Sequence, residues 1–199
     1  MATTLLLDYG AVISLTQSDE DLRGIEAVVP DVPPAALWEA YWAHRLAYDL
    51  GMDDAEYWAA VLGRPATGDE LDQLVRRDVE SWLHVDERVA GALPALRERG
   101  VRLGLLSNAP VPIARRIEEQ PWAQSLHTLT FSCDIPAAKP DPAAYVAALD
   151  ALGAAAEEVV FVDDRAENVE GARAVGITAI HFTEAGVALE EVMAQLDLA

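Results

Sequence analysis

LLLDYGAVIS, residues 5–14, is the stretch that decides the fold. Its apolar run stops at an acid, Asp8, and a glycine follows two positions later, at Gly10. Consecutive apolar positions are typical of a strand buried on both faces of a parallel sheet. Because ligands bind beyond the carboxyl ends of such strands, Asp8 is a candidate nucleophile. A nucleophile normally has a proton-handling partner close by, so the glycine at position 10 needs an explanation.

Four later segments repeat this pattern of a short apolar run followed by a turn and a helix-like stretch. They are VRLGLLSN at residues 101–108, LTFSC at 129–133, EVVFVDD at 158–164 and ITAIHF at 177–182. Their apolar residues are continuous and do not alternate with polar ones, which favours strands with both faces covered. The sequence therefore predicts an α/β fold with a doubly wound, Rossmann-like parallel sheet.

Three helices between these strands have recognisable ends. We predict them over residues 86–100, 141–153 and 165–176. Asp86 and Asp141 are suited to cap the first two, and Gly100 and Gly153 are suited to end them. Pro94 lies inside the first pattern, where we expect it to kink or restart the helix.

An insertion separates the first strand from the second. A simple crossover between parallel strands needs about a dozen residues, and residues 9–100 far exceed that length. The excess has helical spacing and no strand signal, so we predict a small helical unit over residues 16–85. Residues 1–15 and 86–199 then form the α/β core. We expect the recurring Trp38, Trp42 and Trp58 to be buried inside the helical unit, and Trp82 to be buried as well.

Composition excludes several classes of partner. The formal net charge of −20 would repel a phosphate backbone over most of the surface, which argues against nucleic acid. No apolar run is long enough for a signal peptide or a membrane span, so we expect no membrane association. Cys133 is the single cysteine, which fits a reducing cytoplasm, and we interpret it as a core residue.

Polar residues gather where the predicted strands end. Besides Asp8, these are Ser107 and Asn108 after the second strand, Asp163 and Asp164 after the fourth, and Lys139 in the loop after the third. Taken alone, an acid or a serine after a strand is often only the cap of the next helix. Two adjacent acids are harder to dismiss, because they repel each other unless a cation or solvent relieves them.

Four segments, in this order, resemble the four sequence motifs of the haloacid dehalogenase-like hydrolases. They are DYGAVIS at residues 8–14, LLSNAP at 105–110, AAKPDP at 137–142 and VFVDDRAEN at 160–168. The resemblance covers residues 1–15 and about 86–185. It also implies that the insertion is the helical cap that many members carry just after the first strand.

The resemblance implies a phosphatase in which Asp8 attacks a phosphoryl group and carries it as an aspartyl phosphate. Ser107 would donate a hydrogen bond to a phosphoryl oxygen, with Asn108 beside it. Lys139 would neutralise charge shared between Asp8 and the phosphate. The implied substrate is a small phosphorylated metabolite.

The same resemblance implies a magnesium site. Asp8 and Asp163 would bind Mg²⁺ through carboxylate oxygens and Gly10 through its backbone carbonyl, with Asp164 nearby. Carboxylates gathered around an anionic substrate need such a compensating charge. Asn168 falls where the family pattern often has an amide.

Gly10 departs from the family pattern, which usually has a second aspartate here as general acid and base. Such proton transfer is worth about 10²–10⁴ in rate. Three interpretations stay open: a slow phosphatase or one that acts on a good leaving group such as a sugar phosphate, a non-catalytic phosphate-binding or regulatory protein, and a dehalogenase. The paired acids after the fourth strand argue against the last, since halide release has no use for them.

The missing acid has a possible source in the helical insertion. Tyr41, His44 and Arg45 lie in one helical segment that a closing cap would bring to the substrate. The alternative is that His44 and Arg45 are surface residues of that helix. We expect the cap to select the substrate, whose identity the sequence leaves open, as it does the oligomeric state.

Overall fold

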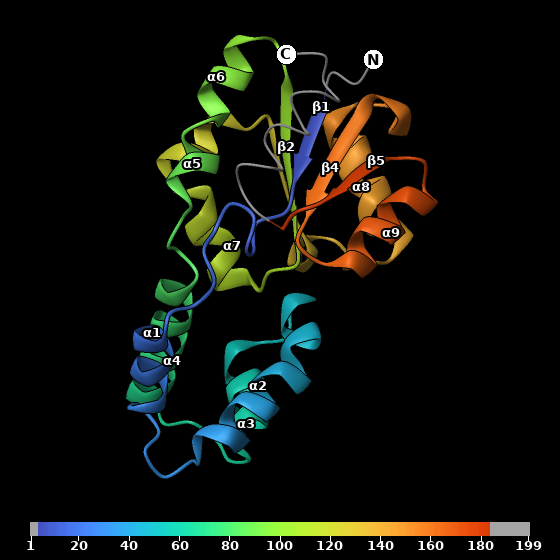
Figure 1. Cartoon of the computed structure of the whole chain (residues 1–199). Helices are drawn as coiled ribbons and strands as arrows, with labels where there is room; N and C mark the ends of the chain where they lie inside the picture. Colours follow the sequence, from blue (N-terminus) through green and yellow to red (C-terminus); the bar gives the residue numbers. More distant parts are fainter. Residues whose placement is uncertain (1–3, 184–199) are drawn as a thin grey trace.

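The computed structural model describes residues 4–183, and its centre is a five-stranded parallel sheet with strand order β3-β2-β1-β4-β5 (Figure 1). The strands are β1 Thr4–Leu7, β2 Arg102–Ser107, β3 Thr128–Phe131, β4 Val159–Asp163 and β5 Thr178–His181. This order confirms the predicted doubly wound sheet, because the chain moves outward from β1 in both directions. The predicted core extends to residue 199, and residues 184–199 lie outside the described part.

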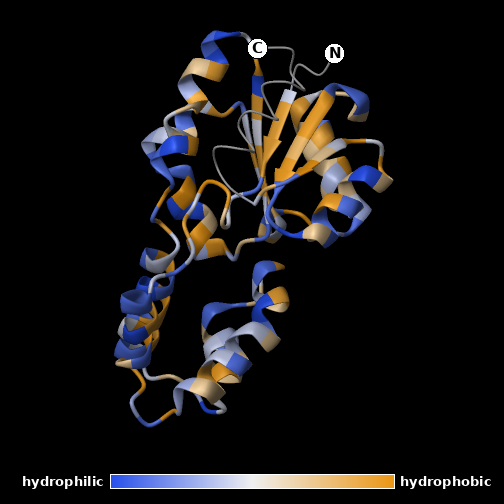
Figure 2. Ribbon diagram, in the orientation of Figure 1, coloured by the Kyte–Doolittle hydropathy of each residue, from blue (hydrophilic) through white to orange (hydrophobic). Residues whose placement is uncertain are grey.

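Both faces of the sheet are covered by helices, as continuous apolar strands require. Leu5 and Leu7 pack on one side with α5 Glu87–Ala90, α6 Leu93–Glu98 and α7 Val111–Glu118. Leu6 points to the other side, toward α8 Pro142–Leu152 and α9 Ala166–Ala174. The strands accordingly form the most apolar part of the ribbon (Figure 2). Three short 3₁₀ turns complete the core, namely η1 Pro121–Ser125, η2 Ser132–Asp134 and η3 Ala156–Glu158.

The predicted helix ends are found with one refinement. Asp86 and Asp141 accept hydrogen bonds from the backbone N–H groups of Arg88 and Ala143, both at 2.9 Å. Gly153 ends α8 at φ +61°, in the left-handed region that favours glycine. The stretch from 86 to 100 forms two short helices, α5 and α6, because Pro94 lies in the first turn of the second, where its missing N–H is tolerated.

Of the six helices between β1 and β2, the first four project from the carboxyl end of the sheet (Figure 1). We call them the cap: α1 Asp19–Glu26, α2 Pro34–Asp49, α3 Asp54–Leu62 and α4 Gly68–Ser81. The cap has an apolar cluster of its own, which includes Tyr41, Tyr57 and Trp58. The chain enters and leaves it through two adjacent segments joined by an antiparallel bridge between Ser14 and Val85.

The tryptophans do not all behave as the helical pattern suggests. Trp58 is fully buried, and Trp38 and Trp82 are partly buried. Trp42 is 55% exposed, so its prediction as a core residue is wrong. The physical reason is that α2 carries aromatic residues on more than one side, and only one side faces the cluster of the cap.

Two further expectations concern Cys133 and the membrane. Cys133 is half-buried and packs against the cluster on the α5–α7 side of the sheet. Burial raises the pKa of its thiol to about 11, which makes it unreactive at neutral pH.

Between residues 4 and 183, none of the helices combines the length and the apolarity needed to span a bilayer.

Candidate active site

Asp8 lies directly beyond the central strand of the sheet. Its backbone N–H donates to the carbonyl of Val162 at 2.9 Å, which continues the pairing of β1 with β4 by one residue. The carboxylate is 7% exposed, and its Oδ1 accepts a hydrogen bond from the N–H of Tyr9 at 2.7 Å. The pattern of one strand thus places a buried carboxylate at the carboxyl edge of the sheet.

Lys139 joins two of the strand ends. Its Nζ lies 2.6 Å from Oδ1 of Asp8 and 2.7 Å from Oδ2 of Asp163, and its side chain is buried. Burial alone would lower the pKa of Lys139, but the two carboxylates raise it above its ordinary value. The amine is therefore a fixed positive charge beside the candidate nucleophile.

Asp163 is held in place by several donors. The N–H of Arg165 donates to its Oδ1 at 2.8 Å, and Nδ2 of Asn168 lies 3.0 Å from both carboxylate oxygens. Asn168 is itself anchored, because the hydroxyl of Tyr145 donates to its carbonyl at 2.7 Å. The structure therefore places Asn168 against the predicted metal ligand and fixes the orientation of that ligand.

Ser107 and Asn108 lie at the end of β2, the strand that pairs with β1. Ser107 is the last residue of β2 and is 3% exposed. Asn108 makes a reciprocal pair with the backbone of Lys139: its Nδ2 donates to the carbonyl and its Oδ1 accepts from the N–H, both at 2.9 Å. Asn108 thus connects the loop after β2 to the lysine loop, in addition to lying beside Ser107.

The predicted metal ligands meet in space. Asp8, Asp163 and Asp164 each offer an oxygen, and these atoms lie within 4.8 Å of one another. Burial is the main cause that raises the pKa of Asp8 to about 7, and burial together with Asp163 raises the pKa of Asp164. One lysine cannot compensate three carboxylates, so the oxygen cluster fits a divalent cation such as Mg²⁺.

Gly10 has no side chain, so it leaves a space two residues after Asp8. A Cβ at this position would meet the Cζ3 atom of Trp82 at 3.8 Å, an ordinary van der Waals contact. The hydroxyl of Tyr9 donates to the carbonyl of Trp82 at 2.5 Å and so ties this segment to the end of the cap. Ala11, the next residue, has φ +54°, an uncommon conformation for a residue with a Cβ.

Arg45 is buried at 8% exposure, so the interpretation of it as a surface residue is wrong. Its Nε donates to Oδ1 of Asp49 at 2.7 Å, its Nη1 donates to the hydroxyl of Tyr41, and the carboxylate of Asp78 lies 3.9 Å away. Its guanidinium also lies over the ring of Trp82, 5.5 Å from the centroid. Sequence reasoning missed these partners because only the spacing of Arg45 and Asp49 by four residues is visible in the chain.

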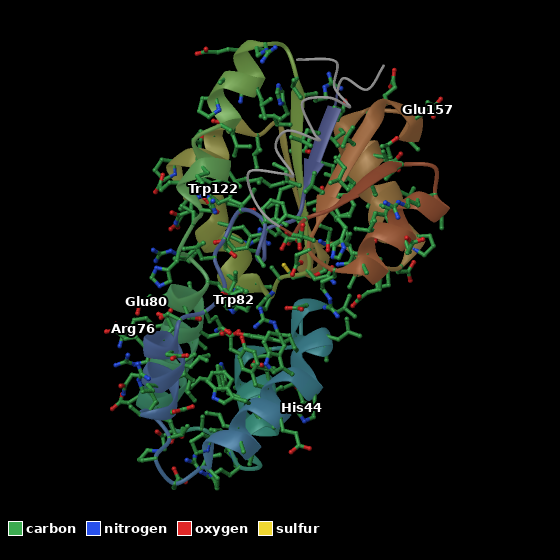
Figure 3. All side chains as sticks on the ribbon, in the orientation of Figure 1. His44, Arg76, Glu80, Trp82, Trp122 and Glu157 are labelled. Atoms are coloured by element: carbon green, nitrogen blue, oxygen red, sulfur yellow. The ribbon has the colours of Figure 1, made fainter. Side chains whose placement is uncertain are left out.

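His44 has a different position. Successive residues of a helix point about 100° apart, so His44 and Arg45 face different directions. Figure 3 shows His44 projecting from the outer side of the cap, away from the core. This placement agrees with the interpretation of His44 as a surface residue of the helix, and a role of His44 at the substrate stays a prediction.

Asp49 and Ser132 are site neighbours that the sequence did not reveal. The hydroxyl of Ser132 donates to the carbonyl of Asp49 at 2.5 Å and accepts from the N–H of Ala109 at 3.0 Å. Burial raises the pKa of Asp49, while Arg45 and, more weakly, Arg165 and Lys139 lower it. The end of α2 is therefore electrostatically coupled to the site.

Comparison with known proteins identifies this arrangement. A family model described as haloacid dehalogenase-like hydrolase matches residues 15–176. The chain belongs to this family. Phosphatase MT3486 of Mycobacterium tuberculosis is 32% identical over 190 residues, covering 91% of this chain and 86% of that protein. The sesquiterpene phosphatase astK of Aspergillus oryzae is 31% identical over 180 residues, covering 90% and 79%.

Solved structures of haloacid dehalogenase-like enzymes share the fold. A family enzyme of Bacteroides thetaiotaomicron, crystallised with magnesium and inorganic phosphate, superposes with a TM-score of 0.74 at 18% identity, covering 94% of this chain and 96% of that chain. The predicted family and its phosphatase type are thereby confirmed. The predicted roles of individual residues stay predictions.

Proposed function

We propose that this chain is a Mg²⁺-dependent phosphomonoesterase that acts on a small phosphorylated metabolite through an aspartyl phosphate on Asp8. The observation that carries the proposal is the meeting of Asp8, Lys139 and the paired acids at one edge of the sheet. Membership in a family with phosphatases among its relatives supports the same reaction.

In the first step an oxygen of Asp8 attacks phosphorus, and the bond from phosphorus to the leaving oxygen breaks. Lys139, 2.6 Å from that carboxylate, opposes the rise that burial causes in the pKa of Asp8 and offsets the charge of the transferring group. Ser107 donates to a phosphoryl oxygen from the neighbouring strand end. Since position 10 provides no acid, the leaving oxygen takes its proton from solvent. Water then hydrolyses the aspartyl phosphate and restores Asp8.

Asp8, Asp163, Asp164 and the carbonyl of Gly10 would hold the Mg²⁺ ion. Bound there, the cation would supply positive charge to the phosphate and to the carboxylates that Lys139 leaves uncompensated. Asn168 and the N–H of Arg165 would keep the carboxylate of Asp163 oriented toward it.

A second candidate function rests on Gly10. A family member without the second aspartate is suited to bind a phosphate compound without turning it over. Dehalogenation is disfavoured, because three clustered carboxylates would repel a leaving halide and serve no step of that reaction.

The test is phosphate release from sugar phosphates, nucleotides and p-nitrophenyl phosphate, with Mg²⁺ or with EDTA. We expect release that requires Mg²⁺ and that Asp8→Asn lowers at least about 10³-fold, because the nucleophile is lost. Asp150→Asn, an exposed acid of α8, is the matched control and should keep full activity. Absence of release from every substrate, in a folded protein that binds Mg²⁺ and phosphate, would favour the binding function.

A further inference from the structure

One side of α2 exposes a row of large apolar side chains. Trp42, Leu46 and Leu50 are 55%, 58% and 43% exposed, although large apolar side chains in residues 4–183 are mostly buried. A spacing of four residues places them along one side of the helix, over a length of roughly 12 Å at 1.5 Å per residue. We call these three residues the apolar row of α2.

The apolar row begins beside the candidate nucleophile. The ring of Trp42 packs edge-on against Trp82, with centroids 6.4 Å apart. Trp82 in turn lies 3.8 Å from the position that a Cβ of Gly10 would occupy, two residues from Asp8. Figure 3 shows Trp82 at the junction of the cap and the core.

The far end of the row is also against the core. The carbonyl of Asp49 accepts from Ser132, and a Cβ at Gly51 would lie 3.7 Å from the carbonyl of Cys133. The C-terminal end of α2 thus meets the core near the β3 loop, while Trp42, in the middle of the helix, contacts Trp82 at the end of the cap. The apolar row runs between these two contacts, on the side of the cap next to the candidate site.

The charged groups next to the row are already paired with one another. Arg45 is shared among Asp49, Asp78 and the hydroxyl of Tyr41, and that hydroxyl donates to Asp78 at 2.7 Å. Recruiting Arg45 to a substrate anion would leave buried carboxylates unpaired, which is costly. The cap therefore offers apolar side chains to a substrate, while Arg45 stays paired within the cap.

We propose that the apolar row of α2 binds the alcohol part of the substrate, and that this part is an apolar alkyl or aryl group. The proposal rests on the proposed phosphatase function and specifies its substrate class. Trp82 and Trp42 would contact this group together with Leu46 and Leu50. A sugar or a second anionic group on this surface would bury little apolar area of its own and would lose water from its polar atoms.

A series of linear alkyl phosphates, ethyl to octyl, tests the proposal below their micelle-forming concentrations. We expect kcat/KM with Mg²⁺ to rise with each added methylene, by up to about fourfold where burial is complete. Hexyl and octyl phosphate should exceed glucose phosphates and hexane bisphosphate. A flat series, or higher kcat/KM for sugar phosphates, would overturn the proposal.

Variants connect the chain-length dependence to the row. Leu46→Ala and Trp42→Ala should each reduce the rise with chain length, with recovery in Trp42→Phe. Val146→Ala on α8, where Val146 is 48% exposed, is the matched control and should leave the series unchanged. Equal series for Leu46→Ala and the native chain would refute the proposal.

The outcomes separate this inference from the proposed function. If Asp8→Asn abolishes release from p-nitrophenyl phosphate but chain length has no effect, the phosphatase stands and the inference fails. If no substrate releases phosphate, the proposed function fails first. The alternative occupant of the row is a second copy of the chain, and native mass spectrometry tests it by measuring the oligomeric state. If Leu46→Ala dissociates a dimer but leaves the dependence of kcat/KM on chain length unchanged, the row serves self-association and the proposal is overturned.

Discussion

Gly10 is the residue at which this chain departs most from the chemistry of its family. The space for a side chain exists, because a Cβ would find its nearest neighbour, a carbon of Trp82, at 3.8 Å. The backbone of Gly10 also lies outside the left-handed region, so a larger residue is not strained there. A steric clash therefore does not explain the glycine, and the effect that we propose for it is on proton transfer.

Gly10→Asp should therefore increase turnover. We expect kcat with an alkyl phosphate to rise at least about tenfold, since a general acid contributes 10²–10⁴ in favourable positions. The gain should be small with p-nitrophenyl phosphate, whose leaving group needs no proton. Gly10→Asn has nearly the same shape without an ionisable group, and it should show no gain. Equal kinetics for the two variants would contradict a role for the missing acid.

At the scale of an element, α1 shows how polar residues define a helix end. The hydroxyl of Ser18 accepts from the N–H of Asp21 at 3.1 Å, and the carboxylate of Asp21 accepts from the N–H of Ser18 at 2.9 Å. Nε2 of His84 lies 3.3 Å from the same carboxylate. Burial slightly opposes ionisation, but the bonds from Ser18 and His84 lower the pKa of Asp21 below 3.8.

Asp21→Asn should lower the free energy of unfolding by about 0.5–1 kcal/mol at neutral pH, the usual value of such a cap. A lowered pKa stabilises the fold above the ordinary value of 3.8, and this contribution is lost as pH falls through the folded pKa. The difference between native and variant should thus shrink toward about pH 3. Urea unfolding at both pH values measures it, with Asp72→Asn on α4 as control. A difference independent of pH would contradict the assignment to charge.

At the scale of the whole molecule, two of the hydrogen bonds that join cap and core lie near β1 and near β3. Near β1, Tyr9 bonds to the carbonyl of Trp82, and near β3, Ser132 bonds to the carbonyl of Asp49. Ser132 also accepts from the N–H of Ala109, in the loop that follows Ser107 and Asn108. One hydroxyl thus connects the end of α2 to the loop after the candidate phosphate-binding residues Ser107 and Asn108.

Ser132→Ala should loosen this connection. Two buried backbone groups would lose their partner, which typically costs about 1–3 kcal/mol. We expect faster amide hydrogen exchange in the last turn of α2 with little change in α1, as well as a lower free energy of unfolding. Ser125→Ala in η1 is the control. Unchanged exchange in α2 would show that Ser132 does not restrain the cap.

Much of the sheet was predictable because its signals are local. Continuous apolar runs ending in Asp8, Ser107 or Asp163 require strands buried on both faces, and parallel strands bring their carboxyl ends to one edge. Pro94 similarly marked the division between α5 and α6. The cap was less predictable, because its helices have several apolar sides and the chain does not say which side packs. Trp42 and Arg45 were therefore assigned to the wrong environments.

By itself, the sequence determined the family, the polar residues at the ends of the strands and the absence of an acid at position 10. Each of these depends on residues that are close together in the chain. Only the tertiary structure decided that Arg45 is neutralised within the cap, that Ser132 joins α2 to the loop after β2, and that Trp42, Leu46 and Leu50 remain exposed beside the site. These features depend on how the cap packs against the core. That packing is set by contacts between residues far apart in sequence, which no local pattern encodes.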